Sequence, residues 1–405
     1  MAELLVRVGS GDAALVRRIF DTRTATPRRL LPNRIVTDAH AALTNPDLAS
    51  VARRAGIPFV VDPQTFYLQG EQHPEDPWSQ LSFADAAKLT PADLSSEDRM
   101  DRLVAKCLEF QLERGASVLV PPYVHVERGA DGWGEVQAAL WHRTRRYLDQ
   151  QDLQLPVLAV LALGWRLLDR NLWPSAFHPL SGALTQLAPT EVALAASKVD
   201  RGAHPDHRLV SLLSAIGQMK KTFPVIAWQQ GTLGEAAVAA GAAGYETGVG
   251  WREHCDLQTA MSQHRKPKNP DGGFSPRPVY IRALGTSIPK RTVAELMSQP
   301  RIAPNLVCVE ANCCSNGRDD LLRDARQHAI TSRAQLLHEL AEPAQPAWQW
   351  NVLARRSATA LEIAEQINRV AAKSDSALKI DTSHLRAINV VAENRRKTLG
   401  RRRAA

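Results

Sequence analysis

The sequence has no long apolar run and little cysteine. No stretch approaches the roughly 18 consecutive apolar residues of a membrane-spanning helix. The opening segment, MAELLVRVGSGDAALVRR, lacks the apolar core of a signal peptide. We therefore expect a cytoplasmic protein with no membrane partner. Its five cysteines are odd in number and clustered, which does not suit a secreted disulfide framework and favours reduced thiols or metal ligands.

The composition excludes global disorder, because 44% of the residues are hydrophobic and only 23% are charged. A chain of 405 residues can form one barrel of about 250 to 300 residues with an appendage, or two domains. The net charge is +8, and part of the excess lies in the last segment, ENRRKTLGRRRAA. Such a tail favours polyanions such as nucleic acid. The alternative is a solubilising, frayed terminus.

Short apolar runs recur along the chain, and each is followed by a helix-like segment. They are nearly continuous rather than alternating, which indicates parallel strands buried on both faces. About eight such β–α units predict a (β/α)₈ TIM-like barrel. A doubly wound open sheet is the alternative, although no Gly-x-Gly-x-x-Gly follows the first strand. The runs are residues 4–10, 34–40, 57–63, 117–122, 156–164, 191–197, 224–231 and 244–250.

The alternation of apolar runs and helix-like segments stops after about residue 265, where a Pro/Gly/Lys-rich loop begins. We predict a TIM-like barrel domain at 1–290 and a metal-binding subdomain at 291–345. The segment AEPAQPAWQW reads as a linker, so residues 346–405 form a helical, basic C-terminal extension in this prediction.

Three of the five cysteines lie within LVCVEANCCSNGRDDLLRDARQH. Structural zinc takes four ligands in a tetrahedron, mostly thiolates with an imidazole. We expect Cys308 at a strand end, Cys313 and Cys314 in the turn that follows, and His328 folding back from the start of a helix. His338, further along that helix, is the alternative fourth ligand. In a competing interpretation, Cys308 is a buried strand residue and the other two cysteines are incidental.

In a barrel, chemistry is located where strands end on the carboxyl-terminal face. Asp62 ends an apolar strand and is a candidate general acid or base, with an Asx-turn before Pro63 as the alternative. Glu246 lies near the end of another strand and is a second candidate. Further polar residues near strand ends are Asp38, His40, Lys198 and Asp200. The mouth could be lined for a planar ligand by Tyr123, His125, Trp165 and Trp228, each of which could equally pack in the core.

These segments, taken in order, resemble the tRNA-guanine transglycosylase superfamily, in particular its DNA-modifying branch that inserts 7-deazaguanine bases. CVEANCC…H lies where the family has a zinc subdomain of three cysteines and a histidine. RIVTDAHAAL resembles its Asn-Thr-Tyr-His-Leu strand and places His40 on the histidine. RRAGIPFVVDPQTFYLQ resembles the segment ending Pro-Ile-Leu-Thr-Asp-Ser-Gly-Gly-Phe-Gln and places Asp62 on the aspartate. This chain departs from the family in having Pro63-Gln64-Thr65 after that aspartate, and in its cysteine spacing.

The resemblance implies a base exchange in DNA or tRNA, in which guanine is replaced by a 7-deazaguanine-type base through a covalent intermediate. Asp62 would move protons. Glu246, the carboxylate nearest the family's nucleophile position, would be the nucleophile. The implied substrate contacts are His40, Tyr123 and Trp165, and the implied ligands of a structural Zn²⁺ are Cys308, Cys313, Cys314 and His328. Two alternatives are a non-catalytic zinc-containing nucleic-acid-binding protein on a decayed barrel and an unrelated TIM-barrel enzyme acting on a small molecule.

Overall fold

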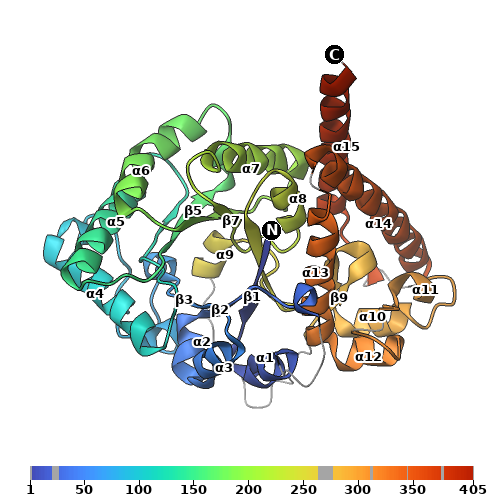
Figure 1. The fold of residues 1–405 in the computed structure, drawn as a ribbon, viewed down its shortest axis with the longest axis horizontal. Coiled ribbons are helices and arrows are strands. Elements are labelled where there is room, and N and C mark those ends of the chain that lie inside the picture. The colour runs from blue at the N-terminus through green and yellow to red at the C-terminus, as the bar shows by residue number, and fades with distance from the viewer. Residues whose placement is uncertain are drawn as a thin grey trace.

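Eight parallel strands form one curled sheet, with helices around its outside (Figure 1). The computed structural model describes residues 2–20, 27–262, 277–310, 313–343, 345–374 and 378–404. The strand order is β3-β2-β1-β8-β7-β6-β5-β4. The strands are β1 (Glu3–Val8), β2 (Arg34–Asp38), β3 (Phe59–Asp62), β4 (His125–Val126), β5 (Leu158–Gly164), β6 (Glu191–Ser197), β7 (Val225–Ala227) and β8 (Gly244–Gly248).

Single parallel bridges join the two edges of this sheet. Val60 of β3 pairs with Val118, and Leu119 pairs with Val157 just before β5. The sheet therefore closes on itself as a TIM-like barrel, as the sequence predicts. The predicted strand at 117–122 is wrong in its extent, because Pro121 and Pro122 have no N–H to continue a ladder. Regular pairing resumes only at β4.

The strands are largely apolar because both of their faces are covered. Every residue of β5 is buried, and so are six of the seven residues of β6. The outer helices are α1 (Ala13–Ile19), α2 (Ala39–Thr44), α3 (Asp47–Ala55), α4 (Glu97–Glu113), α5 (Trp133–Gln150), α6 (Trp173–Leu187), α7 (Pro205–Met219), α8 (Gly234–Ala239) and α9 (Leu257–Ser262). Short 3-10 turns lie at Ser10–Asp12, Arg28–Leu30, Thr65–Gln69, Pro77–Gln80, Asp93–Ser95, Trp165–Leu168 and Arg282–Leu284.

The remaining chain packs beside the barrel as a hairpin and a group of helices. A second apolar core lies here, and α14 contributes to both cores, with Trp350 in the barrel core and Ile367 in the second. No helix in the described part of the chain is both long and apolar enough to cross a bilayer. The elements are β9 (Val279–Ile281), β10 (Thr286–Ile288), α10 (Lys290–Leu296), α11 (Ala303–Leu306), α12 (Arg318–Arg323), α13 (Ala325–Ala341), α14 (Pro346–Ser374) and α15 (Ser383–Ala404).

Helix α13 is fastened to the barrel by polar as well as apolar contacts. Ile330 and Leu337 belong to the barrel core. Arg333 is buried, and its Nη1 donates a hydrogen bond to the carbonyl of Gly231 at 2.6 Å. Its Nη2 forms an ion pair with Glu253 at 2.8 Å. The far end of α15, which carries the basic tail, projects from the body of the molecule (Figure 1).

Candidate active site and metal centre

Arg7 is the centre of a buried ionic cluster at the carboxyl ends of four neighbouring strands. This β1 residue is only 4% exposed. Its Nη1 lies 2.5 Å from Asp38 Oδ1, its Nη2 lies 2.8 Å from Asp62 Oδ2, and its Nε lies 3.0 Å from Glu246 Oε1. The carboxylates come from β2, β3 and β8, which with β1 are neighbours in the sheet. The fold thus brings Asp62 and Glu246 together on one guanidinium.

Backbone groups and a phenol complete the coordination of these carboxylates. Tyr123 donates its hydroxyl hydrogen bond to Asp62 Oδ1 at 3.0 Å. The N–H of Gln64 donates to the same oxygen at 3.1 Å, and the N–H of Gln229 donates to Glu246 Oε2 at 2.9 Å. Gln64 and Gln229 both adopt positive φ, 51° and 55°. Left-handed backbone costs energy in a residue with a side chain, and in both glutamines it accompanies an N–H that donates to a carboxylate of the cluster.

The cluster carries more negative than positive charge. Arg252 also forms an ion pair with Asp38, so two guanidiniums face three carboxylates. Burial raises the pKa of Asp62 and of Glu246 further than the charge of Arg7 lowers it. Burial also acts on Asp38, but Arg252 and Arg7 together hold the pKa of that carboxyl well below its usual range. Asp62 and Glu246 therefore hold a proton more readily than Asp38 does.

These opposite shifts predict opposite effects on acid stability. The ionised Asp38 stabilises the fold at pH values above about 4, the pKa of an aspartate in the unfolded chain. This contribution is lost progressively as the pH falls from there toward the lower pKa of Asp38 in the folded state. The folded state binds a proton on Asp62 more tightly than the unfolded chain, so protonation of Asp62 offsets part of the acid loss. Asp38→Asn should therefore lose less unfolding free energy than wild type between pH 7 and pH 3, and Asp62→Asn should lose more. Urea titrations at both pH values measure this, and equal losses in both variants would contradict it.

Sequence reasoning missed Arg7, the residue that organises the cluster. The available signal was a single arginine inside LLVRVG, an otherwise apolar strand. A charge in a strand covered on both faces is expensive unless it is paired. That pattern indicates a buried partner of opposite charge, but it does not say which one.

The other predicted contact residues lie around this cluster in different ways. His40 is in the first turn of α2, with Nε2 3.8 Å from Asp38 Oδ2. Trp165 follows β5, and its ring lies under the guanidinium of Arg208 at 4.0 Å. Asp200 accepts a hydrogen bond from Thr232 at 2.8 Å and pairs with His254 rather than with the Arg7 cluster. Their roles in binding stay predictions.

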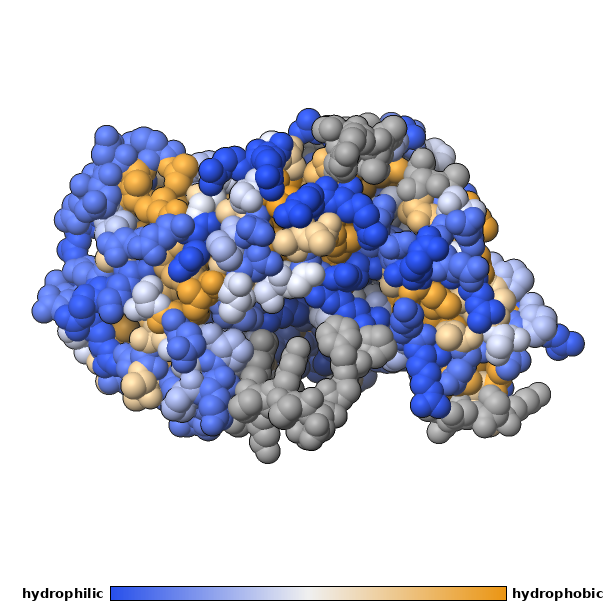
Figure 2. Space-filling view, turned by 90° about the horizontal axis from the view of Figure 1, so that it is seen from below, coloured by the Kyte–Doolittle hydropathy of each residue, from blue (hydrophilic) through white to orange (hydrophobic). Residues whose placement is uncertain are grey.

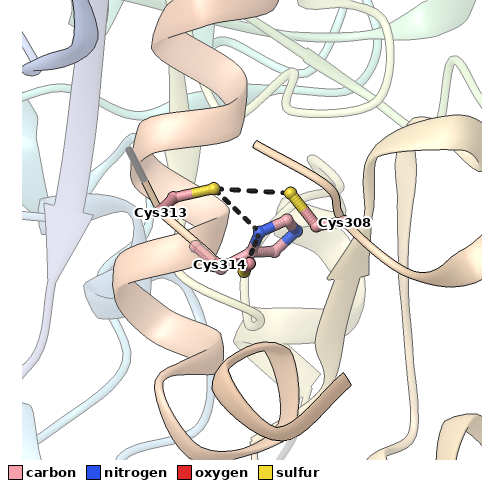
Figure 3. Close-up of side chains that lie close together, drawn as sticks. Cys308, Cys313 and Cys314 are labelled. Atoms are coloured by element: carbon pink, nitrogen blue, oxygen red, sulfur yellow. Dashed lines mark hydrogen bonds between the residues drawn. The ribbon is translucent and has the colours of Figure 1, made fainter. Parts of the chain in front are cut away.

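The four predicted metal ligands converge beside the barrel. Figure 3 labels the three cysteines among them. Their ligand atoms all lie within 4.8 Å of one another. Cys308 Sγ is 3.4 Å from Cys313 Sγ, and His328 Nδ1 is 3.6 Å from Cys313 Sγ and 3.3 Å from Cys314 Sγ. A tetrahedral site with metal–sulfur bonds of about 2.3 Å separates its ligands by roughly 3.5–4 Å. This cluster can therefore hold a metal ion.

The contacts of His328 favour metal binding through Nδ1. Its Nε2 lies 3.0 Å from the carbonyl of Tyr280, so Nε2 carries the proton that it donates there. Nδ1 then presents a lone pair to the sulfurs, the arrangement by which metal-binding histidines are oriented. His338 lies ten residues along α13, about 15 Å away, and is not part of this cluster. The predicted strand end at Cys308 is wrong, because this residue follows α11 in irregular structure.

Two sizeable cavities in the described part of the chain lie outside the ionic cluster. One of about 710 Å³ is bounded by α8, α13, α14 and the segment around Cys308. The other, of about 670 Å³, lies beside the loop after β1. Neither is lined by Asp62 or Glu246, both of which are fully buried. The carboxylates of the cluster are thus covered in this structure.

Comparisons with known proteins return likenesses of fold alone. No family model matches the chain, and no curated protein matches it. A GH18 chitinase from Pseudoalteromonas aurantia is 9% identical, with 64% of this chain and 98% of that chain covered and a TM-score of 0.39. A phosphonomutase from Burkholderia cenocepacia J2315 is 14% identical, with coverages of 61% and 86% and a TM-score of 0.34. A D-allulose 3-epimerase from Methylomonas sp. is 12% identical, with coverages of 61% and 84% and a TM-score of 0.32.

These three structures are enzymes, and none of the three is a transglycosylase by its description. Their low identity and low structural overlap carry no argument about the reaction of this chain.

Proposed function

We propose that the chain is a barrel enzyme that exchanges a base in nucleic acid, with Asp62 and Glu246 as its working carboxylates. The observation that carries the proposal is their convergence on Arg7 from β3 and β8. Two carboxylates at the ends of different strands are the arrangement that a barrel enzyme needs for acid–base and covalent chemistry at one bond. The nature of the bond, an N-glycosidic one, comes from the sequence resemblance.

In the proposed reaction Glu246 attacks C1′ of the target nucleotide. A C–O bond forms, the C1′–N bond breaks, and the departing base takes its proton from Asp62. The incoming 7-deazaguanine-type base then returns a proton to Asp62 while its nitrogen attacks C1′ and displaces Glu246. The raised pKa of Asp62 suits a group that must hold and release a proton. Arg7 would hold both carboxylates in position.

The cysteine–histidine cluster would hold a structural Zn²⁺ through Cys308, Cys313, Cys314 and His328. Three sulfurs and one imidazole nitrogen are the donor set of structural zinc sites. Zinc would supply a crosslink between the segment around Cys308 and helix α13, and no step of the exchange passes through it.

A second candidate is an enzyme acting on a small molecule at the same carboxylates. The complete burial of Asp62 and Glu246 favours this alternative, because a flipped-out nucleotide needs a wider entrance than a small ligand does. In both candidates the cluster around Arg7 is the active site.

Base exchange can be tested with radiolabelled guanine or 7-deazaguanine and either DNA or tRNA. We expect Asp62→Asn to lower the rate of label incorporation by about 10²- to 10⁴-fold, because a general acid–base contributes roughly this much. Asp206→Asn, a carboxylate change on the surface helix α7, is the matched control and should leave the rate unchanged. A wild-type protein that incorporates no label into either nucleic acid would contradict base exchange and favour the small-molecule candidate.

A further inference from the structure

The cavity beside the carboxyl end of β1 is lined by basic side chains. It lies where the loop at 9–11 meets α12 and the start of α13. Its described lining contains a single carboxylate, that of Asp324. The basic residues of the lining are Arg18, Arg277, Lys290, Arg323 and Arg326.

A buried aspartate fixes two of these arginines in place. Asp12 is fully buried, and its Oδ2 accepts a hydrogen bond from the N–H of Gly9 at 2.8 Å and an ion pair from Arg277 at 2.9 Å. Its Oδ1 pairs with Arg326 of α13 at 2.6 Å. A guanidinium has five N–H donors, so both arginines keep donors for a ligand. The barrel loop, the segment before β9 and α13 thus build one site.

The remaining cations leave this cavity with an excess of positive charge. Arg18 and Arg323 share Asp324 at 3.0 and 3.1 Å, and Arg323 also pairs with Asp320. Lys290 has no ion-pair partner among the residues that the structure describes. Five cations therefore face three carboxylates, counting Asp12. A site with several fixed N–H donors and excess positive charge matches a phosphoryl group, whose oxygens accept several charge-assisted hydrogen bonds.

The location of the cavity relates it to the proposed active site. Gly9 is two residues beyond Arg7, a distance of about 7 Å along an extended strand. Figure 2 shows one face of the molecule, on which hydrophilic residues cover most of the surface and hydrophobic residues form smaller patches. A phosphate held at the end of β1 would fix the position of an attached sugar relative to Asp62 and Glu246.

We propose that this cavity binds a phosphoryl group, namely the backbone phosphate next to the nucleotide on which the barrel acts. The assignment of this phosphoryl group to a polynucleotide rests on the proposed base exchange. The binding of a phosphoryl group in the cavity does not rest on it. A free phosphate ester presents the same oxygens, so the test has to separate the two sources.

The test compares the double variant Lys290→Gln/Arg323→Gln with wild type. Arg291→Gln/Lys88→Gln is the matched control, because it also removes two cations and neither residue lines the cavity. Arg291 is the chain neighbour of Lys290, and its side chain is 90% exposed. Thermal unfolding confirms that each variant is folded. Affinity for single-stranded DNA and RNA oligonucleotides is measured over a salt series, with inorganic phosphate as a second probe. We expect the slope of log affinity against log salt to become less negative by about 2 in the cavity variant only.

A cavity variant with the wild-type slope and affinity for both probes would overturn the proposal. Loss of inorganic phosphate binding in a protein that never binds oligonucleotides would keep the phosphoryl site but overturn its assignment to a polynucleotide. Failure of the base-exchange proposal gives a different result, namely a wild-type protein that binds oligonucleotides but incorporates no label. If both proposals hold, Asp62→Asn should lower the exchange rate by about 10²- to 10⁴-fold and leave the oligonucleotide affinity and salt slope as in wild type.

Discussion

Replacing Arg7 by methionine is expected to lower the free energy of unfolding by about 3–5 kcal/mol. The guanidinium is the common partner of Asp38, Asp62 and Glu246, all of which are buried. Methionine fills a similar length of space without a charge, so these carboxylates lose the cation that offsets their desolvation. Urea unfolding at pH 7 measures the loss.

Two further variants identify its cause. Adding Asp62→Asn and Glu246→Gln to Arg7→Met should recover part of the loss, because two unpaired buried charges are removed. Arg99→Met is the control, since Arg99 also pairs with two carboxylates, those of Asp85 and Asp93, but is about a third exposed. It should cost less than about 1 kcal/mol. A triple variant no more stable than Arg7→Met would show that charge burial is not the reason for the loss.

Cys314→Ser is expected to remove the metal and to unfold the region around it. We expect the purified protein to hold about one zinc per chain, as in other Cys₃His sites. Cys314 and Cys308 lie in the second apolar core, so loss of the metal also removes support from that core. Structural zinc can contribute about 10–16 kcal/mol of binding free energy to folding. Elemental analysis and thermal unfolding of the same samples measure both effects.

Cys107→Ala is the control for the metal experiment. Cys107 is fully buried in α4 as part of the barrel core, so this variant changes a buried thiol without touching the cluster. It should retain zinc at the wild-type ratio. A wild-type protein that is folded and free of metal would contradict the assignment of the site, and so would equal metal loss in Cys107→Ala and Cys314→Ser.

The barrel could be predicted from sequence because its strands have no polar face to obscure the pattern. Runs such as EVALAAS match β6 residue for residue. The run at 117–122 looked equally apolar, but its two prolines interrupt the ladder, and only isolated bridges remain. The positions of Asp62 and Glu246 near strand ends were also readable. Their shared partner was not, because Arg7 and Glu246 are 239 positions apart and only the pairing of β1 with β8 makes them neighbours.

The metal ligands were predictable for a different reason, since cysteine is scarce and three cysteines lie within seven residues. The choice between His328 and His338 depended on where α13 begins, and helix boundaries are poorly determined by sequence. The basic cavity left no local pattern at all. Arg277, Asp12 and Arg326 meet only through tertiary packing.

Helix α13 fixes the relative positions of the basic cavity, the cysteine–histidine cluster and the barrel. Arg326 contacts Asp12 at the basic cavity, His328 belongs to the cysteine cluster, and Arg333 is bound to Gly231 and Glu253 of the barrel. Inserting one residue between Arg326 and Arg333 would rotate one end of the helix by about 100° relative to the other. We therefore expect an insertion or deletion between Arg326 and Arg333 to break at least one of these three sets of contacts.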